Sequence, residues 1–125
     1  MSAANYDILI EQGATFKMTL TLKDVNATPI NLQGLTFRGK VKKDFSDVVE
    51  KANFTFTVLD QSVVDNLGKV EVTISATQTA ALVAVGKGTS RTLNNFVYDI
   101  ESEDLSGFVV RWLQGLAKVS PEVTK

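Results

Sequence analysis

Short runs of alternating apolar and polar residues, separated by turn signals, constrain the fold of this chain more than any other feature. The clearest run covers residues 15–23, in which Phe16, Met18, Leu20 and Leu22 alternate with Lys17, Thr19, Thr21 and Lys23. A period of two is typical of a β-strand with one buried face and one solvated face. The run therefore predicts a strand that covers one side of a hydrophobic core.

The same pattern places about seven strands along the chain. We expect them at residues 6–10, 15–23, 35–42, 54–59, 69–74, 95–103 and 108–119. Residues 75–83 differ, because they are rich in alanine, which favours helix, and Ser75 or Thr77 can cap a helix start. A short helix is therefore predicted there, and the loop 44–52 is expected to hold a short helical turn at 46–50.

Turn residues separate these strands. Gly13 follows Gln12, and Gly107 closes the predicted hairpin turn 104–107, because glycine accepts the positive φ that tight turns need. Pro121 has no backbone donor, so the last strand should stop near Ser120. Regular strand spacing with turn signals indicates a sandwich or barrel. We predict an all-β fold, an immunoglobulin-like antiparallel β-sandwich of about seven strands with one short helix.

Two charged stripes sharpen this prediction. Arg38, Lys40 and Lys42 share one face of the third predicted strand, and Asp99, Glu101 and Glu103 share one face of the sixth. Opposite charges on neighbouring strands stabilise a solvated sheet face by a few tenths of a kcal/mol per pair, about the size seen for exposed ion pairs. The third and sixth strands are adjacent in immunoglobulin-like sandwiches. We therefore expect the two stripes to face each other across one sheet.

Composition limits the chemistry that this chain can perform. Its 125 residues suit a single domain, 1–125, and its formal net charge of −1 favours neither nucleic acid nor an anionic membrane as a partner. It contains no Cys and no His, so thiolate chemistry and the usual neutral-pH general base are excluded. No apolar run is long enough for a transmembrane helix, and no signal peptide is recognisable at the start. We expect no cofactor, no metal and no catalytic residues.

Two groups of charged residues are candidates for a functional site. The carboxylates Asp99, Glu101, Glu103 and Asp104 resemble neither the carboxylate pair of a glycosidase facing a cleft nor the converging oxygens of a calcium site. The basic residues Arg38, Lys40, Lys42 and Lys43 lack the interleaved aromatic rings of a single-strand nucleic-acid platform. We interpret both groups as a solvated charged face.

The last predicted strand is apolar on both faces, so it is either covered on both sides or exposes an adhesive edge, which a partner subunit would cover in an assembly. Trp112 is expected to share a face with Val110 and Gln114. Tryptophan in a strand is usually part of the core, but it is also enriched at binding hot spots and can stack on sugars. Our candidate interface residues are Phe108, Val110, Trp112 and Tyr6, with the first strand as a second docking edge.

Four segments carry a resemblance to a known family. They are IEQGATF at 10–16, TPINLQGLT at 28–36, VTISAT at 72–77 and SPEVT at 120–124. With them the whole chain resembles a family of small structural proteins of tailed phages and prophages, similar to the N-terminal β-sandwich domain of phage upper-baseplate proteins. Asn31 and Gln33 depart from the Asp and Thr that are commoner in the second segment. These segments resemble scaffold motifs rather than catalytic ones.

The resemblance implies a non-enzymatic virion structural protein, made in the host cytoplasm and assembled into the particle. A baseplate or tail adaptor that docks onto other virion structural proteins is the leading hypothesis, and a homo-oligomer is compatible with it. Two alternatives stay open: a capsid decoration protein, and a carbohydrate-binding module for host attachment that uses Trp112, Tyr6 or Tyr98. An enzyme is the least favoured class.

Overall fold

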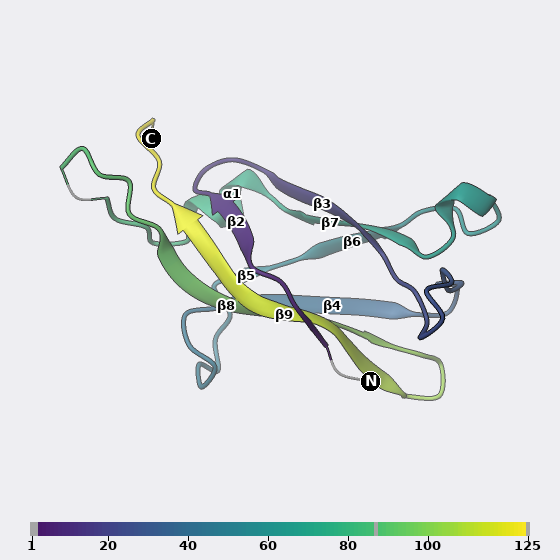
Figure 1. Ribbon diagram of the computed structural model, residues 1–125. Helices are drawn as coiled ribbons and strands as arrows, with labels where there is room; N and C mark the ends of the chain where they lie inside the picture. The colour runs from purple at the N-terminus through teal and green to yellow at the C-terminus, as the bar shows by residue number, and fades with distance from the viewer. Residues whose placement is uncertain (1–2, 87, 125) are drawn as a thin grey trace.

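The computed structural model describes residues 3–86 and 88–124, which form two β-sheets packed face to face (Figure 1). The larger sheet has the order β1 (Ala4–Asn5), β9 (Val109–Ser120), β8 (Asn94–Glu103), β4 (Thr36–Lys42) and β5 (Ala52–Asn53), and β2 (Ile8–Glu11) also pairs with β9. The smaller sheet has the order β3 (Phe16–Thr21), β7 (Lys69–Ile74) and β6 (Thr55–Val58). A short helix α1 (Ala76–Ala80) and a 3₁₀ turn η1 (Val64–Asn66) lie in the connections.

The predicted all-β sandwich is confirmed. Each predicted strand overlaps an observed one, the first at β2, and the pattern did not reveal the two-residue strands β1 and β5. As expected, the third and sixth predicted strands, now β4 and β8, are neighbours in one sheet. The predicted helix is also present, and Ser75 caps it by accepting a hydrogen bond from the backbone N of Gln78 at 3.2 Å.

One pairing departs from the antiparallel prediction. β1 and β2 run parallel to β9, with Ile8 opposite Ala117 and Ile10 opposite Val119. Both isoleucines are buried in this register, so the pairing closes the core beside the last strand. The chain then turns at Gly13 and enters the smaller sheet as β3.

The core lies between the sheets and is filled from alternate positions of both. Its fully buried large side chains include Ile10, Leu32, Val41, Val70, Val72, Ile74, Leu82, Ile100 and Val119. Phe54 lies where the chain crosses from β5 to β6, and its ring centroid is 5.8 Å from that of Tyr98 and 6.4 Å from that of Phe16. Such edge-on contacts are a favoured geometry for aromatic pairs. The aromatic cluster therefore joins the two sheets.

A bulge in β9 overturns the expected alternation around Trp112. Ile100 pairs with Leu113 and Glu101 pairs with Arg111, so Trp112 is the extra residue on β9. A bulge shifts the phase of the alternation. Trp112 packs against the core and its Nε1 donates to Ser102 Oγ at 2.9 Å. Gln114 instead pairs with Asp99 on the outer face, so the prediction that Trp112 and Gln114 share a face is wrong.

The expected helical turn at 46–50 is also wrong, since residues 43–51 form turns and bends without a helix. The loop is closed by backbone hydrogen bonds instead, from Asp47 N to Asp44 O and from Lys51 N to Val41 O. The Asp47 carboxylate further accepts from Asp44 N at 3.1 Å. Aspartate side chains that bond to nearby backbone groups compete with helix formation.

Gln61 is a buried amide that holds together the loops at one end of the sandwich. Its Oε1 accepts from the backbone N of Leu32 and of Gly68, both at 3.0 Å. Its Nε2 donates to the carbonyl oxygens of Leu59 and Asn66 at 2.8 and 2.9 Å. The side chain thus links the β3–β4 connection to the β6–β7 connection.

Replacing Gln61 with Leu should destabilise the protein strongly. The change leaves buried backbone donors and acceptors without partners, and each such group costs about 1–3 kcal/mol. We expect the free energy of unfolding in urea to fall by about 3 kcal/mol or more. Gln33→Leu, at an exposed position of the β3–β4 connection, is the matched control and should change it little. A loss below about 1 kcal/mol in Gln61→Leu would contradict this role.

Candidate functional site

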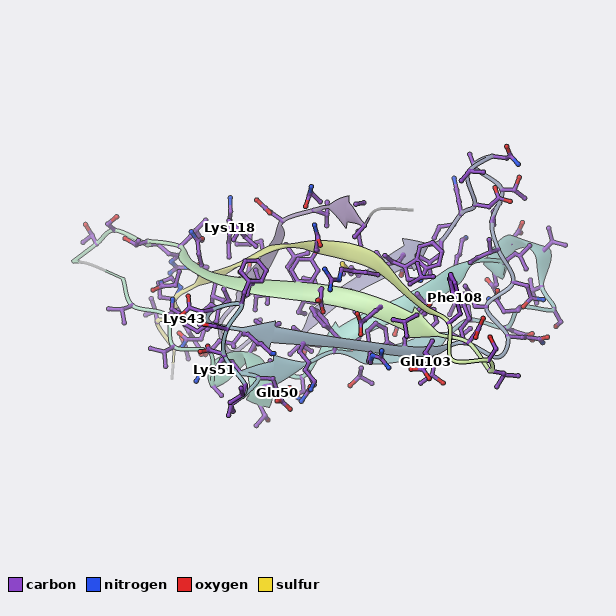
Figure 2. The ribbon with its side chains drawn as sticks, turned by 90° about the horizontal axis from the view of Figure 1, so that it is seen from below. Lys43, Glu50, Lys51, Glu103, Phe108 and Lys118 are labelled. Carbon is purple, nitrogen blue, oxygen red and sulfur yellow. The ribbon has the colours of Figure 1, made fainter. Side chains whose placement is uncertain are left out.

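The four candidate interface residues lie in two different environments. Phe108, just before β9, is 67% exposed, and Tyr6, between β1 and β2, is 56% exposed. Val110 and Trp112 are partly buried, and Val110 pairs with the buried Ser102. Figure 2 places Phe108 near Glu103 at one end of the large sheet, with Lys43, Glu50 and Lys51 at the other end. Phe108 and Tyr6 are therefore accessible, whereas Trp112 belongs mainly to the core.

Tyr6 is held in place by a junction at the interruption of the first strand. Its backbone N donates to Gln114 O at 2.8 Å, and its carbonyl accepts from the Tyr98 hydroxyl. Asp7 Oδ1 accepts from the backbone N of Leu116 at 3.0 Å. A Cβ on Gly115 would lie 2.5 Å from Tyr6 O, so glycine is needed for this close approach. The junction fixes the backbone that carries the exposed Tyr6 ring.

Burial raises the pKa of Tyr98 from the ordinary 10.0 to about 12, and the nearby Asp7 charge adds to the effect. The unfolded chain therefore releases this proton at a lower pH than the folded chain does. It follows that the contribution of Tyr98 to stability is complete below pH 10 and is lost as the pH rises towards 12.

The Tyr98→Phe variant tests this contribution. We expect wild type to be more stable than the variant below pH 10, because the hydroxyl donates to Tyr6 O. That advantage should shrink between pH 10 and pH 12, as measured by urea unfolding at a series of pH values. Subtracting the variant curve removes the lysine titrations that both proteins share. A constant advantage across this window would contradict a raised pKa for Tyr98.

A second junction ties the two ends of the chain together around Gln12. The Gln12 side chain donates from Nε2 to Leu82 O at 2.8 Å and accepts at Oε1 from the backbone N of Glu122 at 3.0 Å. Its own backbone N donates to Ser120 O at 3.0 Å. We call this arrangement the Gln12 clamp. It joins the IEQGATF segment directly to the SPEVT segment.

Gly13 completes the clamp with a backbone conformation that other residues avoid. Its φ is 85°, and the Glu122 side chain lies directly over its Cα, where a Cβ would stand. The backbone N of Gly13 donates to Thr79 Oγ1 at 3.1 Å, and Thr79 Oγ1 donates to Ala14 O at 2.8 Å. The helix α1 is thus attached to the same turn. The predicted break at Gly13 is confirmed, and its partner is the far end of the chain.

Replacing Gln12 with Ala should release the C-terminal segment from this turn. The backbone N of Glu122 loses its acceptor, so its hydrogen exchange should accelerate about fivefold, for a hydrogen bond worth about 1 kcal/mol. The amide of Leu116, which donates to Asp7, serves as the internal reference. Gln33→Ala is the control variant. Unchanged protection at Glu122 would show that the clamp does not hold the C-terminal segment.

The two charged stripes face each other on the outer side of the large sheet, as predicted. Arg38 pairs in register with Glu101, and Lys40 with Asp99. Arg38 Nε lies 2.6 Å from Glu101 Oε1, and its Nη1 lies 2.8 Å from Glu103 Oε1. The hydrogen bond that Arg38 donates to Glu101, followed by the one it donates to Glu103, raises the pKa of Arg38. These contacts hold β4 and β8 in register.

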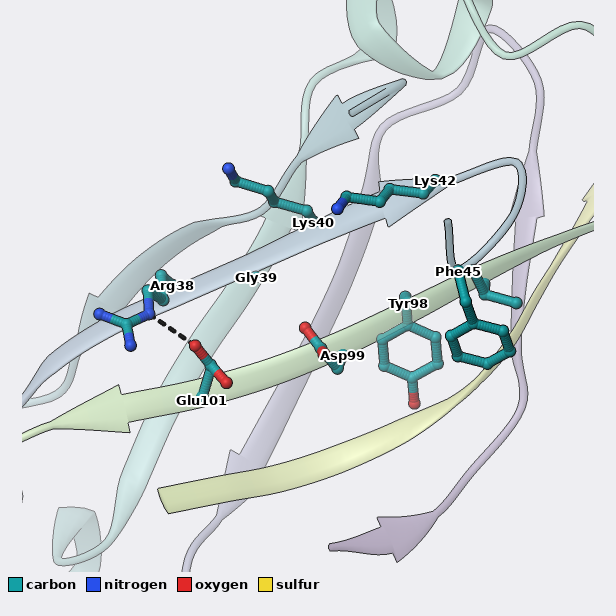
Figure 3. Close-up of a pocket in the computed structure, with 9 residues that line it drawn as sticks. Arg38, Gly39, Lys40, Lys42, Phe45, Tyr98, Asp99 and Glu101 are labelled. Carbon is teal, nitrogen blue, oxygen red and sulfur yellow. Dashed lines mark hydrogen bonds and ion pairs between the residues drawn. The ribbon is translucent and has the colours of Figure 1, made fainter. Parts of the chain in front are cut away.

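A shallow depression of about 290 Å³ lies on this charged face (Figure 3). Lys40, Lys42 and Asp99 line it, with Arg38 and Glu101 at one end and Phe45 at the other. The Phe45 ring is 85% exposed. The pKa of the neighbouring Glu50 is lowered, first by a hydrogen bond from its own backbone, then by Asn53 and by the charge of Lys40. The depression is therefore lined by both signs of charge and one exposed ring.

The carboxylates of this face are already engaged by arginines. Glu101 is bonded to Arg38, and Asp99 Oδ2 lies 3.5 Å from Arg111 Nε. A ligand that approached either carboxylate would therefore compete with the arginine that already contacts it. Among residues 3–86 and 88–124, no three metal-binding side chains come together. The arrangement can order the sheet and present a mixed-charge surface to a partner.

Sequence reasoning missed Phe45 as an accessible ring. The available signal was an aromatic residue between Asp44 and Ser46 in a polar loop, with no strand or helix period to bury it. It also missed Gln12 and Gln61, because a glutamine carries no mark of burial in the sequence. Within the described ranges, no helix is both long enough and apolar enough to cross a membrane.

The fold is an all-β sandwich of a six-stranded and a three-stranded sheet. In comparisons with known proteins, no family model matches the chain and no curated protein gives a significant match.

Proposed function

We propose that this chain is a non-enzymatic structural protein of a tailed-phage particle, a baseplate or tail adaptor that acts by docking onto other virion proteins. The observation that carries the proposal is the Gln12 clamp. Two of the segments that resemble the phage family, IEQGATF and SPEVT, contact each other through Gln12, Gly13 and Glu122. The resemblance thus rests on residues that act together as one scaffold element.

Exposed apolar side chains at the β8–β9 turn support a docking role. Leu105 is 93% exposed and Phe108 is 67% exposed. The turn itself is well ordered, because Asp104 Oδ1 accepts from the backbone N of Ser106 and of Phe108, both at 2.9 Å. A fixed turn that presents two apolar side chains loses little conformational freedom when a partner covers it. Phe108 is therefore our leading contact residue.

A carbohydrate-binding module for host attachment is the second candidate. Of the three rings considered for it, Tyr98 is buried and Trp112 donates its Nε1 to Ser102. The exposed Tyr6 ring is the observation that favours it, and Phe45 adds a second accessible ring. Tyr6 lies between β1 and β2 and Phe45 lies between β4 and β5, so these two rings come from separate segments of the chain.

Immunogold electron microscopy of intact phage, with an antibody against this chain, tests the proposal. We expect gold at the baseplate or tail. Gold over the head would replace the adaptor with a capsid decoration protein. Absence of the chain from purified particles, although it is present in infected cells, would overturn a virion role. Gold at the tail tip with Tyr6-dependent binding to host wall polysaccharide would favour the carbohydrate module.

A matched pair of variants locates the docking surface. Phe108 and Phe45 are both exposed phenylalanines, and they lie at opposite ends of the large sheet. In particles lacking the wild-type chain, Phe108→Ala supplied in trans should be incorporated less than wild type, as measured by mass spectrometry of purified particles. Phe45→Ala should be incorporated normally. Equal incorporation of both variants would remove Phe108 from the interface.

A further inference from the structure

The strand β3 is an open edge of the smaller sheet. It pairs with β7 on one side, and within the described residues no strand pairs with its other side. The first strand lies on β9 of the opposite sheet, so it does not cover this edge. Figure 1 shows β3 at the outside of the smaller sheet.

The inward side chains of β3 are incompletely covered. Phe16, Met18 and Leu20 point into the sandwich but are only partly buried. Their partners on β7, which are Ile74, Val72 and Val70, are each 0% exposed. The difference arises because β7 has a strand on both sides and β3 has only one. A strand added beside β3 would bury this apolar row.

The unpaired backbone groups of β3 belong to Lys17, Thr19 and Thr21. Leu22 N donates to Gly68 O at 2.7 Å, and this pair continues the register in which Phe16 faces Ile74. In an antiparallel ladder, hydrogen-bonded pairs alternate with pairs that are not hydrogen-bonded. The even-numbered residues therefore bond to β7, and the odd-numbered residues direct their N–H and C=O groups to the open side.

The open edge lacks the features that usually block strand addition. Residues 16–21 contain no Pro and no Gly, and their pairing with β7 is regular. Lysine often protects a strand edge, but Lys17 Nζ lies 3.3 Å from Glu71 Oε2 of β7. The other edges are shorter or interrupted: β5 has two residues, β6 has four, and the first strand breaks at residues 6–7.

We propose that two copies of this chain pair through β3, antiparallel and about a two-fold axis at Thr19. In this register Thr19 faces Thr19 of the second copy, and Lys17 faces its Thr21. All three residues with open backbone groups then find partners. Met18 faces Leu20 on the inner side, so apolar residues meet apolar ones and polar residues meet polar ones. Such a self-matching contact is the isologous interface of a symmetric dimer.

Charge selects this register over its neighbours. With the axis at Thr19, each lysine of the edge lies opposite a threonine, since Lys23 would face Thr15. Moving the axis to Leu20 would place Lys17 opposite Lys23, and moving it to Lys17 would oppose two copies of Lys17. Like charges directly opposite are destabilising in a sheet. An axis at Met18 would pair Thr21 with Thr15, which lies before β3 begins.

Charge variants at the axis test the proposal on the purified chain alone, so the result is separate from the virion role. Sedimentation equilibrium should show a dimer for wild type. Thr19→Lys and Thr19→Glu should each be monomeric, because each brings like charges together at the axis. An equimolar mixture of the two should dimerise again. Thr57→Lys, exposed on β6 opposite Glu71 of the same sheet, is the matched control and should stay dimeric.

The proposal would be overturned by a wild type that stays monomeric at millimolar concentration, by a dimer that persists in Thr19→Lys, or by a mixture that fails to associate. Because the chain has no Cys, Thr19→Cys also gives a single labelling position for pyrene. Two labels at the axis should give excimer emission, whereas a label at Thr57→Cys should not. Emission from Thr57→Cys alone would place the contact on β6 and would equally overturn the proposal.

Discussion

The parallel pairing of the first strand with β9 is the constraint on which the rest of the structure depends. It buries Ile8 and Ile10 against the last strand, and each buried side chain of this size stabilises the fold by about 1.5–3 kcal/mol. The strand is short and broken at residues 6–7, so backbone pairing alone would hold it weakly. Tyr98 holds the break and the Gln12 clamp holds its end.

Because the first strand pairs with β9 and not with β3, these two strands differ in how well their inner side chains are buried. A strand that paired with β3 would cover Met18 and Leu20, but it would leave Ala117 and Val119 of β9 exposed. The chain instead buries Ala117 and Val119 of β9 fully and leaves the inner side chains of β3 partly exposed. The smaller sheet keeps a regular edge with three residues whose backbone groups are unpaired.

Periodicity and charge predicted the strands and the neighbourhood of β4 and β8, because both signals are local to one strand and repeat every second residue. Non-local features could not be read this way. The bulge at Trp112 depends on the register between β9 and β8. The parallel pairing of the first strand depends on the turn at Gly13, after which the chain leaves the larger sheet for the smaller one. Of the candidate site, the sequence indicated the accessibility of Phe108, but not the hydrogen bond that draws Trp112 towards Ser102.

The charged face and the open edge of β3 differ in the polar groups that they leave free for a small molecule or a partner chain. On the charged face the carboxylates are satisfied by Arg38 and Arg111, so a ligand would have to displace existing ion pairs to reach them. A strand edge offers unpaired donors and acceptors in a fixed direction, with an apolar row beside them, and a partner strand displaces only water there. Exposed turns such as the one at Phe108 add apolar contacts on a rigid base. The described surface therefore offers a partner chain more unsatisfied groups, at its edges and turns, than its charged depression offers a small molecule.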